Sequence, residues 1–460
     1  MSVPIARRLA EQALAFTPDQ LTQPLIEKAS LCLSDFLSAA FEAADLPWSR
    51  QAAGIAHPCD TGTTAIALGR AVTPGDAAFA NAVAGHGLVR EDMHTASIAH
   101  IGVVVWPALL AFAARSASPI SGPALLSAAV LGYEAGARLG ASLMTAELAR
   151  LFRPTGLIGA FAAAMAVGRL AELDADQLTS ALSLAANCAG GLNEWPAWGG
   201  SEMYFQAGFA ARSGLAVVDL ARAGGYGSPT IVEGQAGLFA AFARRPADTD
   251  IALAVKTDPA ILAVFHKAVP ACNFAQTPAQ AALGAALQYG GPLEAITEIE
   301  VRITRAALLY PGCDSIGPFA NVLKAKMSIQ FAVASAIRHG AIDTRSYANL
   351  DDAQIATLLP KVRLVVDDEL TAAFPAKQGA QVRILTAQGP VAVTRLEDVQ
   401  AATPAMVQAR FDQFAAALLG SDRAQALGTL IAGLPDATQI DPLDRLIRRD
   451  PVDTIVARQP

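Results

Sequence analysis

Three of the six histidines of this 460-residue chain, His86, His94 and His100, fall within one short segment. Two acids, an arginine and two hydroxyl side chains lie between these histidines, although only 16% of the chain is charged. An apolar stretch over residues 101–113 follows directly. Polar groups beside a buried segment require partners, or a substrate that supplies them. Segment 84–100 is therefore where we expect the chemistry of the protein.

The elements that must position this segment are predicted to be helical over about the first 260 residues. Their sequences are rich in alanine and leucine, and Asp174, Asp176 and the glycines at 190–191 mark helix ends. Small residues let helix axes approach closely, which favours a domain with several helices buried on all sides. The main predicted helices cover residues 25–44, 121–144, 158–173 and 177–192.

The pattern changes near residue 265, where apolar and polar residues begin to alternate. This alternation over 296–304, 361–366 and 382–394 predicts half-buried strands, the last with a turn at 388–390. Helical patterns over 321–339 and 351–359 complete an α+β unit with a largely antiparallel sheet.

After residue 400 the pattern is helical again, over 403–418 and 421–433. The simplest arrangement returns this tail to the first helical domain. We therefore expect a mainly α protein, with a large helical domain from residues 1–264 and 400–460. Residues 265–399 would form a smaller, inserted α+β lid domain.

The composition limits the kinds of partner. The chain is 53% hydrophobic and its charged fraction is well below the roughly 25% of an average soluble domain. This surplus of apolar surface predicts a subunit interface, and we expect a homodimer. A net charge of -7 and a pI of about 5.4, with no run of lysines or arginines, give no attraction for nucleic acid or an anionic membrane.

Cysteine usage and hydropathy predict a cytoplasmic protein. The five cysteines are scattered without a CxxC pair, which fits reduced thiols rather than a disulfide framework. No apolar core of signal-peptide length stands near residue 1. The apolar stretches 101–113 and 156–168 are too short to cross a bilayer, so we expect buried helices there.

Several common chemistries find no support in the sequence. It lacks a P-loop, an HExxH and a GxSxG motif, and the glycines beside His86 do not form a dinucleotide fingerprint. The three clustered histidines are spaced by eight and six residues, which does not place two imidazoles one helical turn apart. We therefore expect no metal site.

The order and spacing of several short motifs together point to a family. The chain resembles the MmgE/PrpD proteins, which include 2-methylcitrate dehydratases, cis-aconitate decarboxylases and iminodisuccinate epimerases. The resemblance implies a helical domain built from both chain ends, an α+β lid, an active site in the cleft, a homodimer, and no metal or organic cofactor. The residues that carry it are Gly85, His86, His100, Pro107, Gly132 to Glu134, Arg138, Phe152 to Gly156, Gly208 to Gly214, Lys267 to Cys272, and Ala325 to Ile329.

Departures from the family pattern bear on the reaction. Dehydratase and decarboxylase members usually carry an Asp-rich stretch before the histidine that matches His100, and here only Asp92 of that stretch is unchanged. Arg153 replaces a usual histidine, and Met203 stands where a lysine is expected. His100, Lys267 and Tyr310 are retained. Two positions that usually carry acid/base groups are therefore altered, and the segment around them has more positively charged side chains than is usual in the family.

These features predict a cofactor-free carbon-acid enzyme that acts on a small di- or tricarboxylate. Arg90, Arg153 and Lys267 would hold carboxylates and stabilise the charge that builds up when an adjacent proton is removed. An imidazole at His100 suits the general base. The specific prediction is an epimerase similar to iminodisuccinate epimerase. The alternatives are a lyase, either a 2-methylcitrate dehydratase or a cis-aconitate decarboxylase, and an inactive binding or scaffold protein.

Each candidate residue also has a structural interpretation. His94, Tyr310 and Lys267 are candidates for the second proton-transfer group, and His86 for a substrate contact, but a lone histidine or turn tyrosine is often structural. Asp92 is a candidate catalytic acid that could instead cap a helix. Arg153, just before Pro154, could mark a helix start at the surface, and Lys326 and Tyr133 are expected to be structural.

Overall fold

Alanine and glycine let the central helices lie unusually close together. The computed structural model describes residues 3–452, and in it helix α8 (Pro154–Leu170) packs against α6 (Gly122–Leu143) and α11 (Glu202–Arg222). A Cβ added at Gly136 of α6 would lie only 2.8 Å from the Cβ of Ala162 in α8. Larger residues would push these helices apart, so the composition sets the density of the core.

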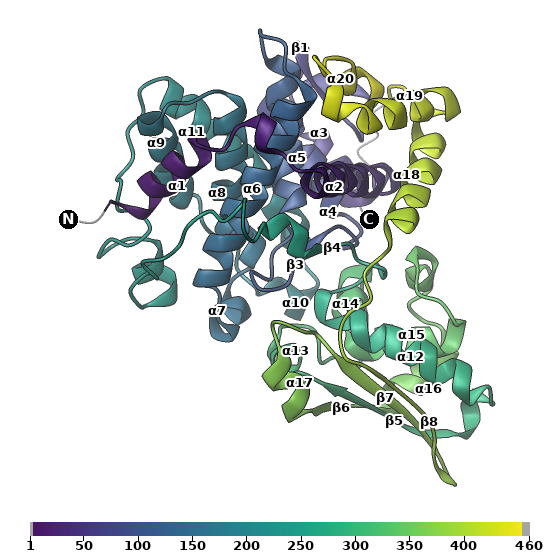
Figure 1. Cartoon of the computed structure of the whole chain (residues 1–460). Coiled ribbons are helices and arrows are strands. Elements are labelled where there is room, and N and C mark those ends of the chain that lie inside the picture. The colour runs from purple at the N-terminus through teal and green to yellow at the C-terminus, as the bar shows by residue number, and fades with distance from the viewer. Residues whose placement is uncertain (1–2, 453–460) are drawn as a thin grey trace.

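The N-terminal part is the helical domain that the sequence predicts (Figure 1). Helix α5, the apolar stretch after His100, is buried despite Pro107 inside it. None of the helices in residues 3–452 is long and apolar enough to cross a membrane. The other helices of this part are α1 (Ile5–Leu14), α2 (Gln23–Glu42), α3 (Pro47–Gly54), α4 (Pro74–His86), α5 (Gly102–Arg115), α7 (Ala146–Leu151), α9 (Ala175–Ala186) and α10 (Trp195–Trp198).

The prediction of helix almost throughout the first 260 residues was wrong in four places. Strands β1 (Pro58–Ala65) and β2 (Arg70–Val72) form an antiparallel hairpin, and β3 (Met93–His94) pairs with β4 (Val264–Phe265). Helix α9 ends at Ala186 instead of continuing to residue 192, since the chain turns before Gly190 and Gly191. Residues 223–263 contain only short helical turns.

The α+β lid lies below the helical domain in Figure 1. Its four-stranded sheet has the order β6-β5-β7-β8, and helices α12 and α15 pack against it. The pairings of β7 are antiparallel, whereas β5 and β6 are parallel because a long helical crossover joins them. The elements are β5 (Ile296–Ile303), β6 (Val362–Val366), β7 (Ala380–Thr386), β8 (Gly389–Leu396), α12 (Gln276–Tyr289), α13 (Arg305–Leu309), α14 (Val322–Met327), α15 (Ile329–His339), α16 (Ala353–Leu358) and α17 (Asp368–Ala373).

The C-terminal helices return to the helical domain, as the yellow end of the chain in Figure 1 shows. Helix α18 (Pro404–Leu419) packs against α2, where the rings of Phe41 and Phe411 are 6.4 Å apart. Helices α19 (Ser421–Ala432) and α20 (Pro442–Leu446) follow, and α20 contacts β1. The mainly α fold class with a small α+β unit is confirmed. The packing of α18 supports the domain division that we propose from the sequence.

Candidate active site

The predicted segment forms an irregular loop between two buried helices. Helix α4 ends at His86, and α5 begins two residues after His100. The turn between them passes through Val89, whose φ of 57° lies in the left-handed region that a β-branched residue rarely adopts. This reversal brings the end of one helix and the start of the next to the same place.

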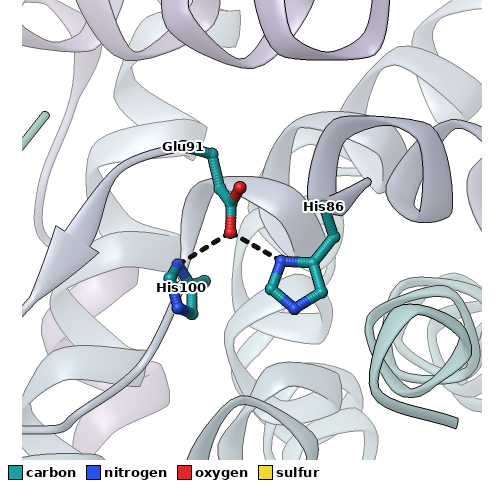
Figure 2. A group of neighbouring side chains, drawn as sticks. All are labelled: His86, Glu91 and His100. Carbon is teal, nitrogen blue, oxygen red and sulfur yellow. Dashed lines mark hydrogen bonds and ion pairs between the residues drawn. The ribbon is translucent and has the colours of Figure 1, made fainter. Parts of the chain in front are cut away.

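Glu91 joins the two histidines that stand at these helix ends. Its Oε1 lies 2.6 Å from His86 Nδ1 and 2.8 Å from His100 Nδ1, as Figure 2 shows. All three side chains are buried. His86 Nδ1 donates to this carboxylate, and His100 Nδ1 faces both the carboxylate and the carbonyl oxygen of Asp92, 3.1 Å away. Since these oxygens only accept hydrogen bonds, both imidazoles carry their proton on Nδ1 and have Nε2 left as an acceptor.

Arg153 extends this cluster toward the lid. It lies just before Pro154, the first residue of α8, in the extended conformation usual before proline. One guanidinium nitrogen donates to His86 Nε2 at 3.0 Å, and another donates to the Tyr310 hydroxyl at 3.3 Å. Arg153 is only 5% exposed, so the predicted surface alternative is wrong. It connects the helical domain to Tyr310 of the lid.

Two buried lysines hold the loop that carries Glu91. Lys267 Nζ donates to the carbonyl of Val89 at 3.0 Å, and Lys326 Nζ donates to the neighbouring carbonyl of Leu88 at 2.7 Å. Lys267 also donates to the carbonyl of Ala271. These bonds stabilise the left-handed turn and fix the position of Glu91.

Burial governs the protonation of the cluster. Burial, together with the charge of Lys267, lowers the pKa of His100 well below its usual value, and burial also lowers the pKa of His86. Burial alone would raise the pKa of Glu91, but the two imidazoles beside it bring that pKa well below the usual range. Burial lowers the pKa of Lys267 to about 8. At neutral pH the cluster therefore contains neutral imidazoles, one carboxylate, and the cations Lys267 and Arg153.

A small cavity lies against this cluster. It has a volume of about 10 Å³, close to the space that one water needs. His100, Arg153 and Tyr310 line it, together with Cys272 and Asn273 from the lid. His100 Nε2 makes no hydrogen bond within residues 3–452, so it is the ring nitrogen left for a ligand.

On the lid side of the cavity, the lining residue Cys272 forms a pair of thiols with Cys313. Cys272 Sγ lies 3.6 Å from Cys313 Sγ, and both residues are buried. The hydrogen bond with Cys313 lowers the pKa of Cys272 to about 7. A thiolate at Cys272 would lie close to Lys267 and partly offset its charge.

Arg90, predicted to bind substrate, lies away from the cavity. Its guanidinium faces α2, with Nη2 3.0 Å from Glu42 Oε2 and 3.2 Å from Ser38 Oγ, and Nη1 3.8 Å from Asp35 Oδ1. The left-handed turn at Val89 sends this side chain to the opposite side of the loop from Glu91. This placement gives Arg90 a structural contact with α2 instead of the predicted contact with a substrate.

His94 and Asp92, both predicted as catalytic, also have other partners. His94 Nδ1 lies 2.9 Å from Ser97 Oγ, outside the cavity lining, and burial lowers its pKa to about 4. Asp92 accepts hydrogen bonds from the Gly102 N–H, at 3.1 Å, and from the Tyr133 hydroxyl. A Cβ at position 102 would lie 2.6 Å from Asp92 Oδ2, so glycine is needed there. Asp92 therefore caps α5, the alternative that the sequence left open.

From the spacing of the histidines in the sequence we expected their imidazoles to lie apart and to form no metal site. The expected separation was wrong. The ligand atoms of His86, Glu91 and His100 lie within 4.8 Å of one another, so the group has donors that a metal could use. In this structure, however, Glu91 Oε1 stands between the two Nδ1 atoms and accepts from both. Arg153 and Lys267 add two positive charges nearby. The geometry and charge fit a hydrogen-bonded triad better than a cation site.

Sequence reasoning missed three residues that belong to the site. Glu91 was seen only as a substituted aspartate, yet it is the acceptor that joins both imidazoles. Its place between two histidines in the sequence was the available signal. Cys272 stood only at the end of the motif from Lys267 and Asn273 gave no signal, because only the folded lid brings them to His100.

Sequence comparisons agree with this architecture. The profile of the MmgE/PrpD N-terminal domain matches residues 7–249, and that of the MmgE/PrpD C-terminal domain matches residues 269–431. The two matches together cover most of the chain, so the resemblance found in the sequence is confirmed. The second match includes α18, which packs on the helical domain.

The relatives with named activities match only about half of this chain. A cis-aconitate decarboxylase from Aspergillus terreus is 29% identical over 217 residues, which are 46% of this chain and 44% of that protein. A cis-aconitate decarboxylase-like protein, oryM, from Aspergillus oryzae is 29% identical over 243 residues, or 51% of this chain and 50% of its own length. The matched part thus spans about half the length of these relatives.

Proposed function

Because the chain belongs to the MmgE/PrpD family, we propose that it is an enzyme that moves a proton on the carbon next to a carboxylate of a small di- or tricarboxylate. The catalytic groups are side chains of the protein, without a cofactor. The observation that carries this proposal is His100, a neutral imidazole with Nδ1 bonded to Glu91 and Nε2 beside a cavity lined by Arg153 and Tyr310. A neutral imidazole accepts a proton, which suits a general base.

The reaction begins when His100 Nε2 removes the proton. Glu91 holds the ring and stabilises the imidazolium that forms, as a buried carboxylate does for a catalytic histidine. Negative charge moves onto the substrate carboxylate, which Arg153 binds and the nearby charge of Lys267 helps to stabilise. His86, bonded to both Glu91 and Arg153, positions these two groups.

Epimerisation is the specific reaction that we propose. It requires a proton donor on the face opposite His100, and the Tyr310 hydroxyl is the candidate, because it lines the same cavity and accepts a hydrogen bond from Arg153. Lys267 is mostly protonated at pH 7 and is a second possible donor. His94 is no longer a good candidate, since it contacts Ser97 instead of the cavity.

Decarboxylation is the second candidate, and the named activity of the Aspergillus relatives favours it. In that reaction the bond to a carboxylate breaks instead of a C–H bond, and a protonated Tyr310 or Lys267 then protonates the carbon. A dehydratase of the 2-methylcitrate type requires the same base and an acid placed for the leaving hydroxide.

One experiment separates these outcomes. The protein is incubated in deuterated water with a panel of di- and tricarboxylates, including cis-aconitate and methylcitrate, and followed by NMR. Deuterium entry with inversion and no loss of atoms supports the epimerase. Release of carbon dioxide or water identifies a lyase, and binding without any exchange identifies an inactive binding protein.

A further inference from the structure

An open cavity on the helical domain is lined mainly by arginines, and we call it the arginine cavity. It has a volume of about 540 Å³ and lies where the hairpin of β1 and β2 meets α19, α20 and the chain after them, at the top of Figure 1. It has no lining residue in common with the cavity beside His100. Five of its eleven lining residues are arginines, namely Arg70, Arg423, Arg445, Arg448 and Arg449.

Backbone contacts bring these arginines together from segments far apart in the sequence. Gly69, in the turn between β1 and β2, has a φ of 67°, and a Cβ there would lie 2.4 Å from the carbonyl oxygen of Arg449. The Val452 N–H donates to the carbonyl of Leu68 at 3.1 Å, and Arg70 Nη2 donates to the carbonyl of Val452 at 3.0 Å. The hairpin is therefore bound to the chain that follows α20, and both contribute to one wall of positive charge.

The cavity has more positive than negative charge. Arg70 and Arg445 form no ion pair within residues 3–452. On the lining, the five arginines stand against two carboxylates, those of Asp60 and Asp450, which leaves three positive charges in excess. Such an excess attracts a counter-anion. The other three arginines are held by ion pairs, Arg423 with Asp450 at 3.5 Å, Arg448 with Asp444 at 3.1 Å and Arg449 with Asp45 at 2.7 Å.

The arrangement of the arginines favours phosphate groups as the anion. A guanidinium can bind either a carboxylate or a phosphate through two parallel hydrogen bonds. A carboxylate has two oxygens in one plane, whereas a terminal phosphate has three oxygens that accept from several directions. Here the arginines come from β2, α19, α20 and the chain after α20, so they approach from several sides.

The size and lining of the cavity indicate a chain of phosphates. Its volume lies within the range of about 300 to 1,000 Å³ that is usual for small-molecule sites, so it has room for more than one phosphate group. Within the described part of the chain, no aromatic side chain lines it, so no ring is present on which a nucleobase could stack. Recognition would therefore depend on the anionic groups alone.

We propose that the arginine cavity binds an oligophosphate, a small molecule with a chain of phosphate groups and three or more negative charges. The ligand neutralises the excess charge and gives Arg70 and Arg445 anionic partners. It also links the hairpin of β1 and β2 to α19 and α20. This site is independent of the proposed function, because the cavity lies apart from His100 and Arg153.

Calorimetry on the full chain tests the proposal, with tripolyphosphate as the probe and citrate as a carboxylate for comparison. We expect one tripolyphosphate per chain, with a Kd below about 1 mM and about tenfold or more below that of citrate. Arg445→Ala and Arg70→Ala should each raise the Kd of tripolyphosphate about tenfold or more, because each removes a charged hydrogen-bond donor. Arg222→Ala is the matched control, since Arg222 is also an exposed arginine in the last turn of a helix, and it should leave Kd unchanged.

The Arg445→Ala variant should fold like the wild type, because the Arg445 side chain is exposed and makes no hydrogen bond within residues 3–452. Absence of tripolyphosphate binding overturns the inference, and so does a Kd that neither Arg445→Ala nor Arg70→Ala changes. An equal loss of affinity in Arg222→Ala would show attraction to the whole surface instead of a site. Citrate that binds as tightly as tripolyphosphate would overturn the assignment to phosphate groups.

Discussion

At His100, one ring nitrogen bonds to Glu91 and the other faces the cavity, so we predict that the imidazole carries the proton transfer. His100→Ala should fold normally and lower kcat by about 100-fold or more. His94→Ala is the matched control, because His94 is also buried in the same loop but contacts Ser97. Steady-state kinetics of the two variants decides the matter, and equal effects would remove His100 from the mechanism.

Arg153 is expected to act on substrate binding. Arg153→His removes a permanently charged, forked contact of about 1.5 to 3 kcal/mol, which should raise KM by about 10- to 150-fold. Proton exchange at saturating substrate should persist, because His100 and Glu91 remain. Arg150→His, three residues earlier on the exposed side of α7, should leave KM unchanged. An unchanged KM in Arg153→His would disprove the contact.

The pH profile should reflect Lys267 on its alkaline side. Burial lowers the pKa of Lys267 to about 8, so its charge is present below pH 8 and lost above it. We expect kcat/KM to fall as the pH rises through about 8, and to show no acid limb near 6.5, because the pKa of His100 is well below that value.

Lys267→Arg, which keeps its charge at all these pH values, should remove the alkaline limb. Persistence of the limb in that variant would assign it to another group near the site. Cys272 and Lys326, each with a pKa lowered to about 7, are the groups to examine next.

At the scale of the elements, Arg90 links the catalytic loop to α2. Its removal leaves the buried carboxylate of Asp35 and the partly buried carboxylate of Glu42 without this partner. We predict that Arg90→Ala lowers the free energy of unfolding by about 3 to 5 kcal/mol, measured by urea denaturation. Arg115→Ala, which breaks the partly exposed pair with Asp219, should cost about 0 to 1 kcal/mol. Similar losses in both variants would contradict the structural role of Arg90.

The sequence predicts elements well where the periodicity is long and apolar. Helix α6 and strand β5 begin and end within a residue or two of their predicted bounds. The hairpin of β1 and β2 was missed because Asp60, Gly62 and the threonines around them give no apolar alternation. Its stability comes from packing and from partners distant in the sequence, such as Asp444 on Thr64.

The candidate cluster could be predicted by region but not by partner. The density of ionisable residues pointed to the loop in which His86, Glu91 and His100 meet, whereas the side chains that face one another depend on the turn at Val89. That turn sends Glu91 to the histidines and Arg90 to α2. A left-handed valine has no sequence signal, because it is held by Lys267 from another domain.

At the scale of the whole molecule, exposed apolar side chains support the homodimer that we propose from the composition. Phe209 is 59% exposed and Leu220 is 53% exposed, eleven residues apart and so on the same face of α11. Light scattering should give a dimer at micromolar concentration, with well over roughly 2,000 Å² buried in total. Phe209→Glu combined with Leu220→Glu should give a monomer, whereas Leu287→Glu on the lid should not. A monomeric wild type would refute the proposal.

The bonds of Arg153 to Tyr310 and of Lys267 to Val89 cross from one domain to the other within the site. A carboxylate bound between them must be released before the lid and the helical domain can unfold separately. Ligand at 100 times Kd therefore adds about 2.7 kcal/mol to the unfolding of both domains together. In a calorimetric scan, two separate melting transitions of the free protein would merge into one. Substrate thus acts as a thermodynamic crosslink, which makes the two domains a single cooperative unit.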